Sequence, residues 1–319
     1  MVIGVDTGNR CIKTRYHTYV SGVTEVSTNA PSAQEELIWL QQGSGKTSKH
    51  VLLPERSGYL LEKDTSEDYF VLTLFAIAKE LETRNIIPVN VIDVKLAVGL
   101  PPRDYVRMKP RYLTYFGRGY QKIRYHGKTY TINISKVFVF PQGGAAIFAL
   151  PEDQLEALKR SPSTYIVDIG GYTTDVMHLN FGIADYANII SLDYGMIHIY
   201  NDAQQAIQAA TGKLPSEAQI DYMLRNNCEI SPAIPMLPIV QQTAREFTKR
   251  LIQKLNETKI DLSLSTPVFM GGGSIALRRD LEEEIGGQPA IFVTSINANA
   301  IGFENMAEAV LAKAGVANA

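Results

Sequence analysis

The same short pattern occurs twice in this sequence, about half the chain length apart. It reads Val-Asp-Thr-Gly-Asn from Val5 to Asn9 and Val-Asp-Ile-Gly-Gly from Val167 to Gly171. Each copy follows an apolar run and precedes a second extended run, so each predicts a strand, a tight turn and a returning strand. Because only two copies exist, the pattern indicates a duplicated domain rather than a solenoid.

Strand and helix signals alternate along the rest of the chain, which predicts an α/β fold. The length of 319 residues suits two domains of ordinary size. Apolar residues at helical spacing predict helices over 68–84 and 238–257. Further helices are expected over 197–210, 274–285 and 299–314 and after Ser216, and strands over 2–5, 11–19, 91–98, 120–126, 128–134, 137–140, 165–167, 176–179 and 268–270.

Composition excludes several classes of protein. The chain has 31 Lys and Arg against 33 Asp and Glu, so it carries no general basic field for coating nucleic acid. Its two cysteines, Cys11 and Cys228, have no histidine partners at metal-ligand spacing, which argues against a disulfide framework or structural zinc. The start of the chain lacks the pattern of a signal peptide, and no apolar run is long enough for a spanning helix. These observations favour a cytoplasmic protein.

The first turn has the residues of a phosphate-binding loop. Turns rich in glycine and hydroxyl residues present backbone N–H groups to phosphate oxygens. Thr7, Gly8 and Asn9 fit such a turn, and Asp6 supplies a hard oxygen for magnesium. Lys13 returns on the second strand, where its ammonium can meet a phosphate. Asp-x-Gly alone is a common turn, so this assignment depends on the second copy.

The second turn is more specific. Asp168 is followed by Gly170 and Gly171, which let the backbone approach a ligand closely, and then by Tyr172 and Thr173. A plain hairpin needs neither the paired glycines nor the hydroxyl groups. We therefore interpret this turn as a second phosphate loop.

A third glycine-rich segment joins a buried strand to a helix. Gly271, Gly272 and Gly273 are followed by Ser274 after the apolar run 268–270. This arrangement predicts room for a flat ring or a phosphate against bare backbone at a helix start.

Together these features resemble the ATPase fold shared by actins, sugar kinases and heat-shock chaperones. The spacing from Asp6 to Lys13 is similar to the first phosphate loop of actins. The run from Asp168 to Asp175 is similar to the second loop of the plasmid-segregating ParM/StbA group. The resemblance follows the chain in order over nearly its whole length. It implies a duplicated actin-like α/β fold, with domain I over 1–160 plus 299–319, domain II over 161–298, and a nucleotide cleft between them.

The resemblance also implies roles for particular residues. Gln142, after the strand ending at Pro141, would orient the water that attacks the γ-phosphate, and Asp168 would share in catalysis. Asp6 and Asp168 would hold the magnesium ion with its waters. Gly195 resembles the segment near the ribose and base, and the run 298–302 resembles a second element connecting the domains.

The function implied is that of a filament-forming NTPase. It would bind Mg²⁺ with ATP or GTP, polymerise with copies of itself and segregate plasmid DNA through a DNA-binding adaptor protein. Neither a helix-turn-helix nor a basic stripe indicates direct DNA binding, and no membrane partner is expected. A small-molecule kinase of the same fold and a non-segregating actin-like scaffold remain the alternatives.

One further motif is set aside. Gly43-Ser44-Gly45-Lys46-Thr47 is similar to the end of a Walker A loop, but that motif requires glycine where this chain has Leu40.

Overall fold

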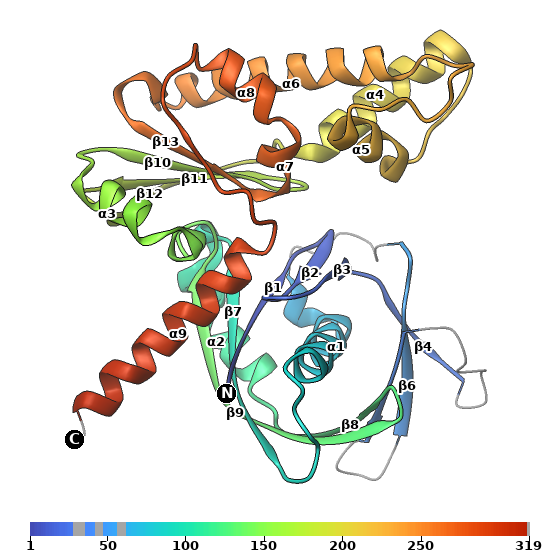
Figure 1. The fold of residues 1–319 in the computed structure, drawn as a ribbon, viewed down its shortest axis with the longest axis vertical. Helices are drawn as coiled ribbons and strands as arrows, with labels where there is room; N and C mark the ends of the chain where they lie inside the picture. The colour runs from blue at the N-terminus through green and yellow to red at the C-terminus, as the bar shows by residue number, and fades with distance from the viewer. Residues whose placement is uncertain (28–35, 42–46, 56–61, 318–319) are drawn as a thin grey trace. The chain divides into compact units, whose positions relative to one another are not determined.

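The computed structural model describes residues 1–27, 36–41, 47–55 and 62–317. Most of the Walker-like run, residues 43–46, lies outside them. The chain forms two compact units, Met1–Ala149 with Asn297–Ala319 and Leu150–Ile296 (Figure 1). The domain limits given by the resemblance remain predictions. Among the described helices, none combines the length and apolar character needed to cross a bilayer.

A curved sheet forms the first unit. Within the described residues it has nine strands in the order β3-β2-β1-β7-β9-β8-β5-β6-β4. β3 and β4 lie at opposite ends of this order although only Ser21 and Gly22 separate them in sequence, so the sheet must curl back toward itself. The strands are β1 (Val2–Thr7), β2 (Cys11–Lys13), β3 (Thr18–Val20), β4 (Val23–Val26), β5 (Leu37–Gln41), β6 (Thr47–Leu52), β7 (Ile92–Leu100), β8 (Gly119–Tyr125) and β9 (Lys128–Pro141).

Helix α1 (Asp68–Thr83) lies inside the curve of this sheet (Figure 1). Its residues from Tyr69 to Ala78 are buried without a break, because strands surround it on several sides. A helix that is apolar all round is typical of such an enclosed position. The other helical segments of this unit are η1 (Lys63–Thr65), η2 (Pro102–Asp104), α2 (Tyr105–Phe116), η3 (Ala146–Ala149) and α9 (Ala298–Ala317).

Helix α9 covers the opposite face of the central strands, where Val2, Ala97 and Phe138 pack with Phe303 and Ala307. The approach is close because two glycines lack side chains. A Cβ on Gly4 would lie 2.0 Å from the Ala300 carbonyl oxygen, and a Cβ on Gly302 would lie 1.9 Å from the Ala145 carbonyl oxygen.

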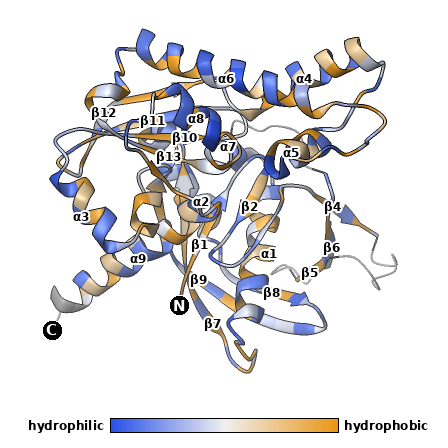
Figure 2. Ribbon diagram, turned by 45° about the horizontal axis from the view of Figure 1, so that its top comes forward, coloured by the Kyte–Doolittle hydropathy of each residue, from blue (hydrophilic) through white to orange (hydrophobic). Residues whose placement is uncertain are grey.

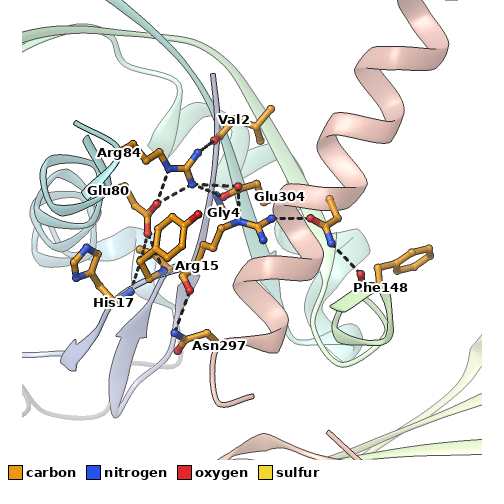
Figure 3. A network of polar contacts seen from close by, with 12 residues as sticks. Val2, Gly4, Arg15, His17, Glu80, Arg84, Phe148, Asn297 and Glu304 are labelled. Atoms are coloured by element: carbon orange, nitrogen blue, oxygen red, sulfur yellow. Dashed lines mark hydrogen bonds and ion pairs between the residues drawn. The ribbon is translucent and has the colours of Figure 1, made fainter. Parts of the chain in front are cut away.

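A buried polar network fixes α9 to β1 (Figure 3). Glu304, only 3% exposed, accepts the Gly4 N–H at 3.1 Å. Its carboxylate also accepts from Arg84 at 2.9 and 3.1 Å and from Arg15 at 2.8 Å. Arg84 in turn donates to Glu80, which is fully buried on α1. The network therefore joins α9, β1, α1 and the turn after β2.

The second unit repeats the strand arrangement of the first. In its described residues a five-stranded sheet has the order β12-β11-β10-β13-β14. β10 pairs antiparallel with β11 and parallel with β13, as β1 pairs with β2 and β7. The elements are α3 (Glu152–Arg160), β10 (Thr164–Ile169), β11 (Thr174–Asn180), β12 (Ile183–Leu192), α4 (Met196–Thr211), α5 (Glu217–Asn226), α6 (Leu237–Glu257), η4 (Leu262–Leu264), β13 (Thr266–Met270), α7 (Gly271–Ala276), α8 (Arg278–Glu284) and β14 (Ile291–Phe292).

Helix α6 packs into the core of this unit, beside α4, α5 and α8, through one stripe of residues that includes Val240, Phe247 and Leu251. Hydrophobic and hydrophilic residues alternate along it in Figure 2, as expected for a helix with one face in the core. A capping box between Ser216 and Gln219 starts α5, which confirms the helix predicted after Ser216.

The structure differs from the prediction in three places. The strand predicted over 11–19 is two strands, because a turn at Thr14–His17 intervenes and donates from Thr14 and Tyr16 to Glu80. The runs 128–134 and 137–140 form one strand, β9, whose register with β7 shifts near Lys95. The single helix predicted over 274–285 is two helices, α7 and α8, divided at the buried Leu277, and α7 begins at Gly271, three residues before the predicted start.

The close packing of α9 predicts opposite effects for one substitution at two sites. Gly302→Ala places a Cβ on the Ala145 carbonyl, and we expect it to lower the free energy of unfolding by about 1–3 kcal/mol. Gly315→Ala, on the same helix with nothing within 4 Å, is expected to raise it by up to about 1 kcal/mol. Urea unfolding of both variants measures the difference. Equal effects would contradict the packing described.

Candidate functional site

The predicted residues of the first loop lie together at the end of β1. Asp6 pairs in register with Lys13, whose ammonium lies 3.5 Å from Asp6 Oδ2. Gln142, which follows β9, donates from Nε2 to Asp6 Oδ1 at 3.0 Å. Asp6 is 3% exposed, so these polar partners stabilise a carboxylate that is largely removed from water.

The turn itself is tight. A Cβ on Gly8 would lie 2.6 Å from the Cys11 carbonyl oxygen, and the Gly8 carbonyl accepts from Ser21 Oγ at 2.5 Å. Asn9 Oδ1 accepts from the Tyr69 hydroxyl at 2.8 Å. The Thr7 hydroxyl is buried and has no hydrogen-bond partner among the described residues. An orphaned donor in a turn of this kind is consistent with a ligand that completes its bonding.

A buried lysine that the sequence analysis did not include lies under this loop. Lys63 of η1 donates from Nζ to the Thr7 carbonyl, and its ammonium lies 5.3 Å from the centre of the Tyr69 ring. Burial lowers its pKa from 10.5 to about 8, with a smaller contribution from Lys13, while Asp6 opposes the shift. In sequence Lys63 stands between Glu62 and Asp64 in a polar run, which indicates a solvated lysine, so pattern alone could not identify it.

The position of Gln142 depends on the two segments predicted to connect the domains. Gly143 has φ +75°, a conformation that favours glycine, and its N–H donates to Asn299 Oδ1 at 3.0 Å. Asn299 belongs to the first turn of α9. On the other side, the Gln142 N–H donates to the Leu100 carbonyl at 2.8 Å. The backbone is therefore held on both sides of the predicted catalytic side chain.

The second loop closes at the end of β10. Asp168 pairs in register with Asp175 on β11 and with Met270 on β13. The Gly170 N–H donates to the Thr173 carbonyl at 2.9 Å, and Thr173 Oγ1 donates to Asp175 at 3.2 Å. The predicted residues Asp168, Gly170, Gly171, Tyr172 and Thr173 thus form one compact turn.

Helix α4 starts against this turn. The N–H groups of Met196 and Ile197 donate to the carbonyls of Gly170 and Gly171, at 3.1 and 2.8 Å. A Cβ on Gly195 would lie 2.5 Å from the Tyr172 carbonyl carbon. Gly195 therefore supports the second loop directly, and its predicted place near a ribose and base stays a prediction.

Two of the three late glycines are required by packing within the unit. Gly271 has φ +85°, and a Cβ there would lie 2.3 Å from Asp168 Oδ1. A Cβ on Gly273 would lie 2.3 Å from Ile169. Gly272 has only Arg225 near its Cβ position, at 3.5 Å, and Ser274 donates to the Gly271 carbonyl at 2.9 Å. The segment thus contacts the second loop, while ligand binding there stays a prediction.

The two loops differ in charge at one equivalent position. The residue opposite the strand-end aspartate is Lys13 in the first loop and Asp175 in the second. Lys13 and Lys63 around Asp6 give the first loop a positive excess at neutral pH, which suits phosphate. Asp168 and Asp175 give the second loop two carboxylates, the ligand type that magnesium prefers.

Magnesium therefore fits the carboxylates of the second loop better than Asp6, whose two oxygens face Gln142 and Lys13. Among the described residues, no group of three or more His, Cys, Asp or Glu side chains could hold a metal ion alone. Magnesium commonly binds through one or two carboxylates together with substrate phosphates and water. The residues present fit that mode of binding.

Comparison with known families supports the fold. Residues 46–144 match the family described as actin like proteins N terminal domain, and residues 166–283 match the archaeal actin homologue MreB-like, C-terminal family. No curated protein matches the sequence. Each match covers less than half of the chain, and both families are described as actin-like or actin homologues.

Solved structures show the same fold over the full length. The crystal structure of the actin-like protein Alp7A is 16% identical with a TM-score of 0.78, covering all of both chains. The archaeal actin homologue Ta0583 in complex with ADP is 20% identical with a TM-score of 0.76, covering 97% of this chain and 99% of that one. A 15-stranded ParM filament from Clostridium botulinum is 18% identical with a TM-score of 0.76 and the same coverage. The predicted duplicated actin-like fold is confirmed.

The burial of Lys63 predicts a pH-dependent stability. Because its pKa is about 8 when folded and 10.5 ordinarily, the unfolded chain binds more protons between these values. The free energy of unfolding therefore rises with pH across this window. Relative to Lys63→Met, we expect the wild-type value to rise by up to about 3 kcal/mol. Urea unfolding of both proteins between pH 8 and 10.5 measures the difference in free energy of unfolding. Tyrosines that ionise in this range are present in both proteins, so their contribution cancels in the difference.

The matched control is Lys128→Met, whose lysine is 55% exposed. The free energy of unfolding of Lys128→Met should differ from that of the wild type by the same amount at every pH in this window. A flat difference for Lys63→Met as well would mean that the ammonium is not desolvated.

Proposed function

We propose that this chain binds ATP or GTP with magnesium at its two loops, hydrolyses it, and assembles into filaments. The observation that carries the proposal is the pair of strand-end aspartate turns with opposite local charge. Lys13 opposite Asp6 favours phosphate oxygens, and Asp175 opposite Asp168 favours a cation. A nucleoside triphosphate with magnesium carries both kinds of charge, so one such complex suits the two loops together.

The first loop would bind phosphate through the backbone of Thr7, Gly8 and Asn9 and through the Lys13 ammonium. Nucleotide-binding loops use N–H groups and a lysine in this way because both are donors that match phosphate oxygens. Asp6 would act on magnesium through its water shell. Bound magnesium would neutralise charge on the phosphate oxygens during transfer.

The second loop would bind the magnesium ion through Asp168 and approach the phosphates with Gly170, Gly171 and Thr173. Tyr172 lies in the same turn as these residues. We assign the nucleoside to the neighbouring backbone, which includes Gly195 and the run Gly271–Ser274. The contact of Gly271 with Asp168 supports this grouping.

Gln142 would position the water that attacks the γ-phosphate. Its Nε2 donates to Asp6, which leaves Oε1 as the amide atom able to accept a hydrogen bond from water. A neutral amide is a poor base, so placement and electrostatic stabilisation would supply most of the rate. Asp168 would contribute through magnesium.

Filament formation and plasmid segregation are proposed from similarity. One structural neighbour is a ParM filament and another is an actin homologue with ADP. The net charge of −2 gives no support to direct DNA coating, so segregation would use a DNA-binding adaptor protein. A small-molecule kinase is the alternative that the next experiment separates from a filament, whereas a non-segregating scaffold would differ in having no DNA-binding adaptor.

Assembly is tested by light scattering of the purified protein with magnesium and ATP, GTP or the corresponding diphosphates. We expect scattering to rise with one triphosphate above a threshold protein concentration, because a filament must nucleate. Pelleting on centrifugation checks that the signal comes from polymer. No rise with any nucleotide would defeat the filament proposal, and turnover that requires an added small acceptor would indicate a kinase.

The role of the second loop is tested with Asp168→Ala. Losing the carboxylate that holds magnesium should lower kcat for hydrolysis by more than about 100-fold. Asp153→Ala, an exposed position on α3 of the same unit, is the control and should keep wild-type turnover. Full activity of Asp168→Ala would remove this loop from the site.

A further inference from the structure

A short segment before α1 makes two sets of charged contacts in opposite directions. Lys63 points to the first loop, where it donates to the Thr7 carbonyl. Its neighbours Glu62 and Asp64 instead pair with arginines of α2. Arg107 and Arg111 donate to Glu62 at 2.8 and 2.9 Å, and Arg111 lies 2.7 Å from Asp64. We call Glu62–Thr65 the η1 segment.

Ser66, the residue after the η1 segment, is also fixed by α2. The Tyr115 hydroxyl donates to the Ser66 carbonyl at 2.5 Å and accepts the Phe70 N–H at 2.7 Å. Tyr69 holds Asn9 through its hydroxyl. Contacts therefore reach the first loop on both sides of Gly8, at Thr7 from the η1 segment and at Asn9 from the first turn of α1.

Stability alone does not account for a lysine at this position. Lys63 is 7% exposed, and desolvating an ammonium opposes folding. An apolar side chain of similar length, such as methionine, would fill the same volume without that cost. The lysine does provide two things that methionine cannot: a donor to the Thr7 carbonyl and a positive charge beside Asp6.

We propose that Lys63 is a positioning residue for polyphosphate binding at the first loop, and that α2 holds it there through the η1 segment. The inference rests on the proposed nucleotide function. Buried as it is, Lys63 acts through the loop rather than by touching the ligand: it fixes the Thr7 carbonyl and directs the Thr7–Asn9 backbone. With Lys13 it also outweighs the charge of Asp6, so the loop attracts anionic oxygens.

The effect of removing the Lys63 charge on nucleotide affinity should depend on the number of phosphates in the ligand. The first loop and its two lysines serve the phosphate chain, and the nucleoside is assigned to other residues. Removing the Lys63 charge should therefore weaken binding of a triphosphate much more than binding of the corresponding monophosphate. A general loss of stability would weaken both alike.

The experiment is calorimetric titration with ATP and AMP, or GTP and GMP, whichever triphosphate the wild type binds. Magnesium is present, and circular dichroism confirms folding. Lys63→Met should lower triphosphate affinity about 10-fold or more, the usual effect of losing a charged hydrogen bond, with monophosphate affinity unchanged. The double variant Arg107→Ala/Arg111→Ala should lower triphosphate affinity several-fold with the same selectivity. These exposed arginines make pairs of small individual worth, so their removal leaves the fold intact.

Lys128→Met and Arg278→Ala are the matched controls, because each residue is exposed and pairs with a carboxylate, Glu82 or Glu282, that belongs neither to the loops nor to the η1 segment. Both should bind as the wild type does. The inference is overturned if Lys63→Met or the arginine double variant keeps wild-type affinity for the triphosphate. It is also overturned if either variant loses affinity for the triphosphate and the monophosphate by the same factor. If the wild type itself binds no nucleotide, the proposed function fails instead.

Discussion

The buried carboxylate of Glu304 fixes the geometry of the first unit. It accepts the backbone N–H of Gly4 and two arginines, so α9 lies directly on β1. From that helix Asn299 accepts the N–H of Gly143, and Gln142, the residue before Gly143, donates to Asp6. The predicted catalytic amide is therefore placed by a chain of contacts that begins at a charge network outside the loop. Breaking a buried network of this kind is costly, because the remaining charges lose their partners.

Duplication explains the scaffold, and one divergent position explains how the two copies differ. Both units place an aspartate at the end of a strand that has an antiparallel neighbour on one side and a parallel neighbour on the other. The cross-strand partner is Lys13 in one copy and Asp175 in the other. The change from Lys13 to Asp175 on the same frame, with Lys63 beside the first loop, gives the first loop a positive excess and the second a negative one.

Periodicity was sufficient to predict the elements whose signals are local. Helices over 68–84 and 238–257 and the repeated strand-turn-strand pattern are confirmed, because burial imposes a strong period on their sequences. The break at Thr14–His17 could not be predicted, since it depends on Glu80, distant in sequence. The strands β4 to β6 and the helix α2 also escaped prediction. In the site, the loop residues follow from motif, whereas Lys63 follows only from three-dimensional burial.

The anchoring of α9 has a consequence for biosynthesis. β1 leaves the ribosome before α9, and its partner Glu304 is 300 residues later. The second unit, Leu150–Ile296, is contiguous and is complete before α9 emerges. Domains fold as units during translation, so the nascent chain passes through a stage in which its second half is folded and its first half still exposes Val2, Ala97 and Phe138. At that stage the amino-terminal half is the part open to chaperones and proteases.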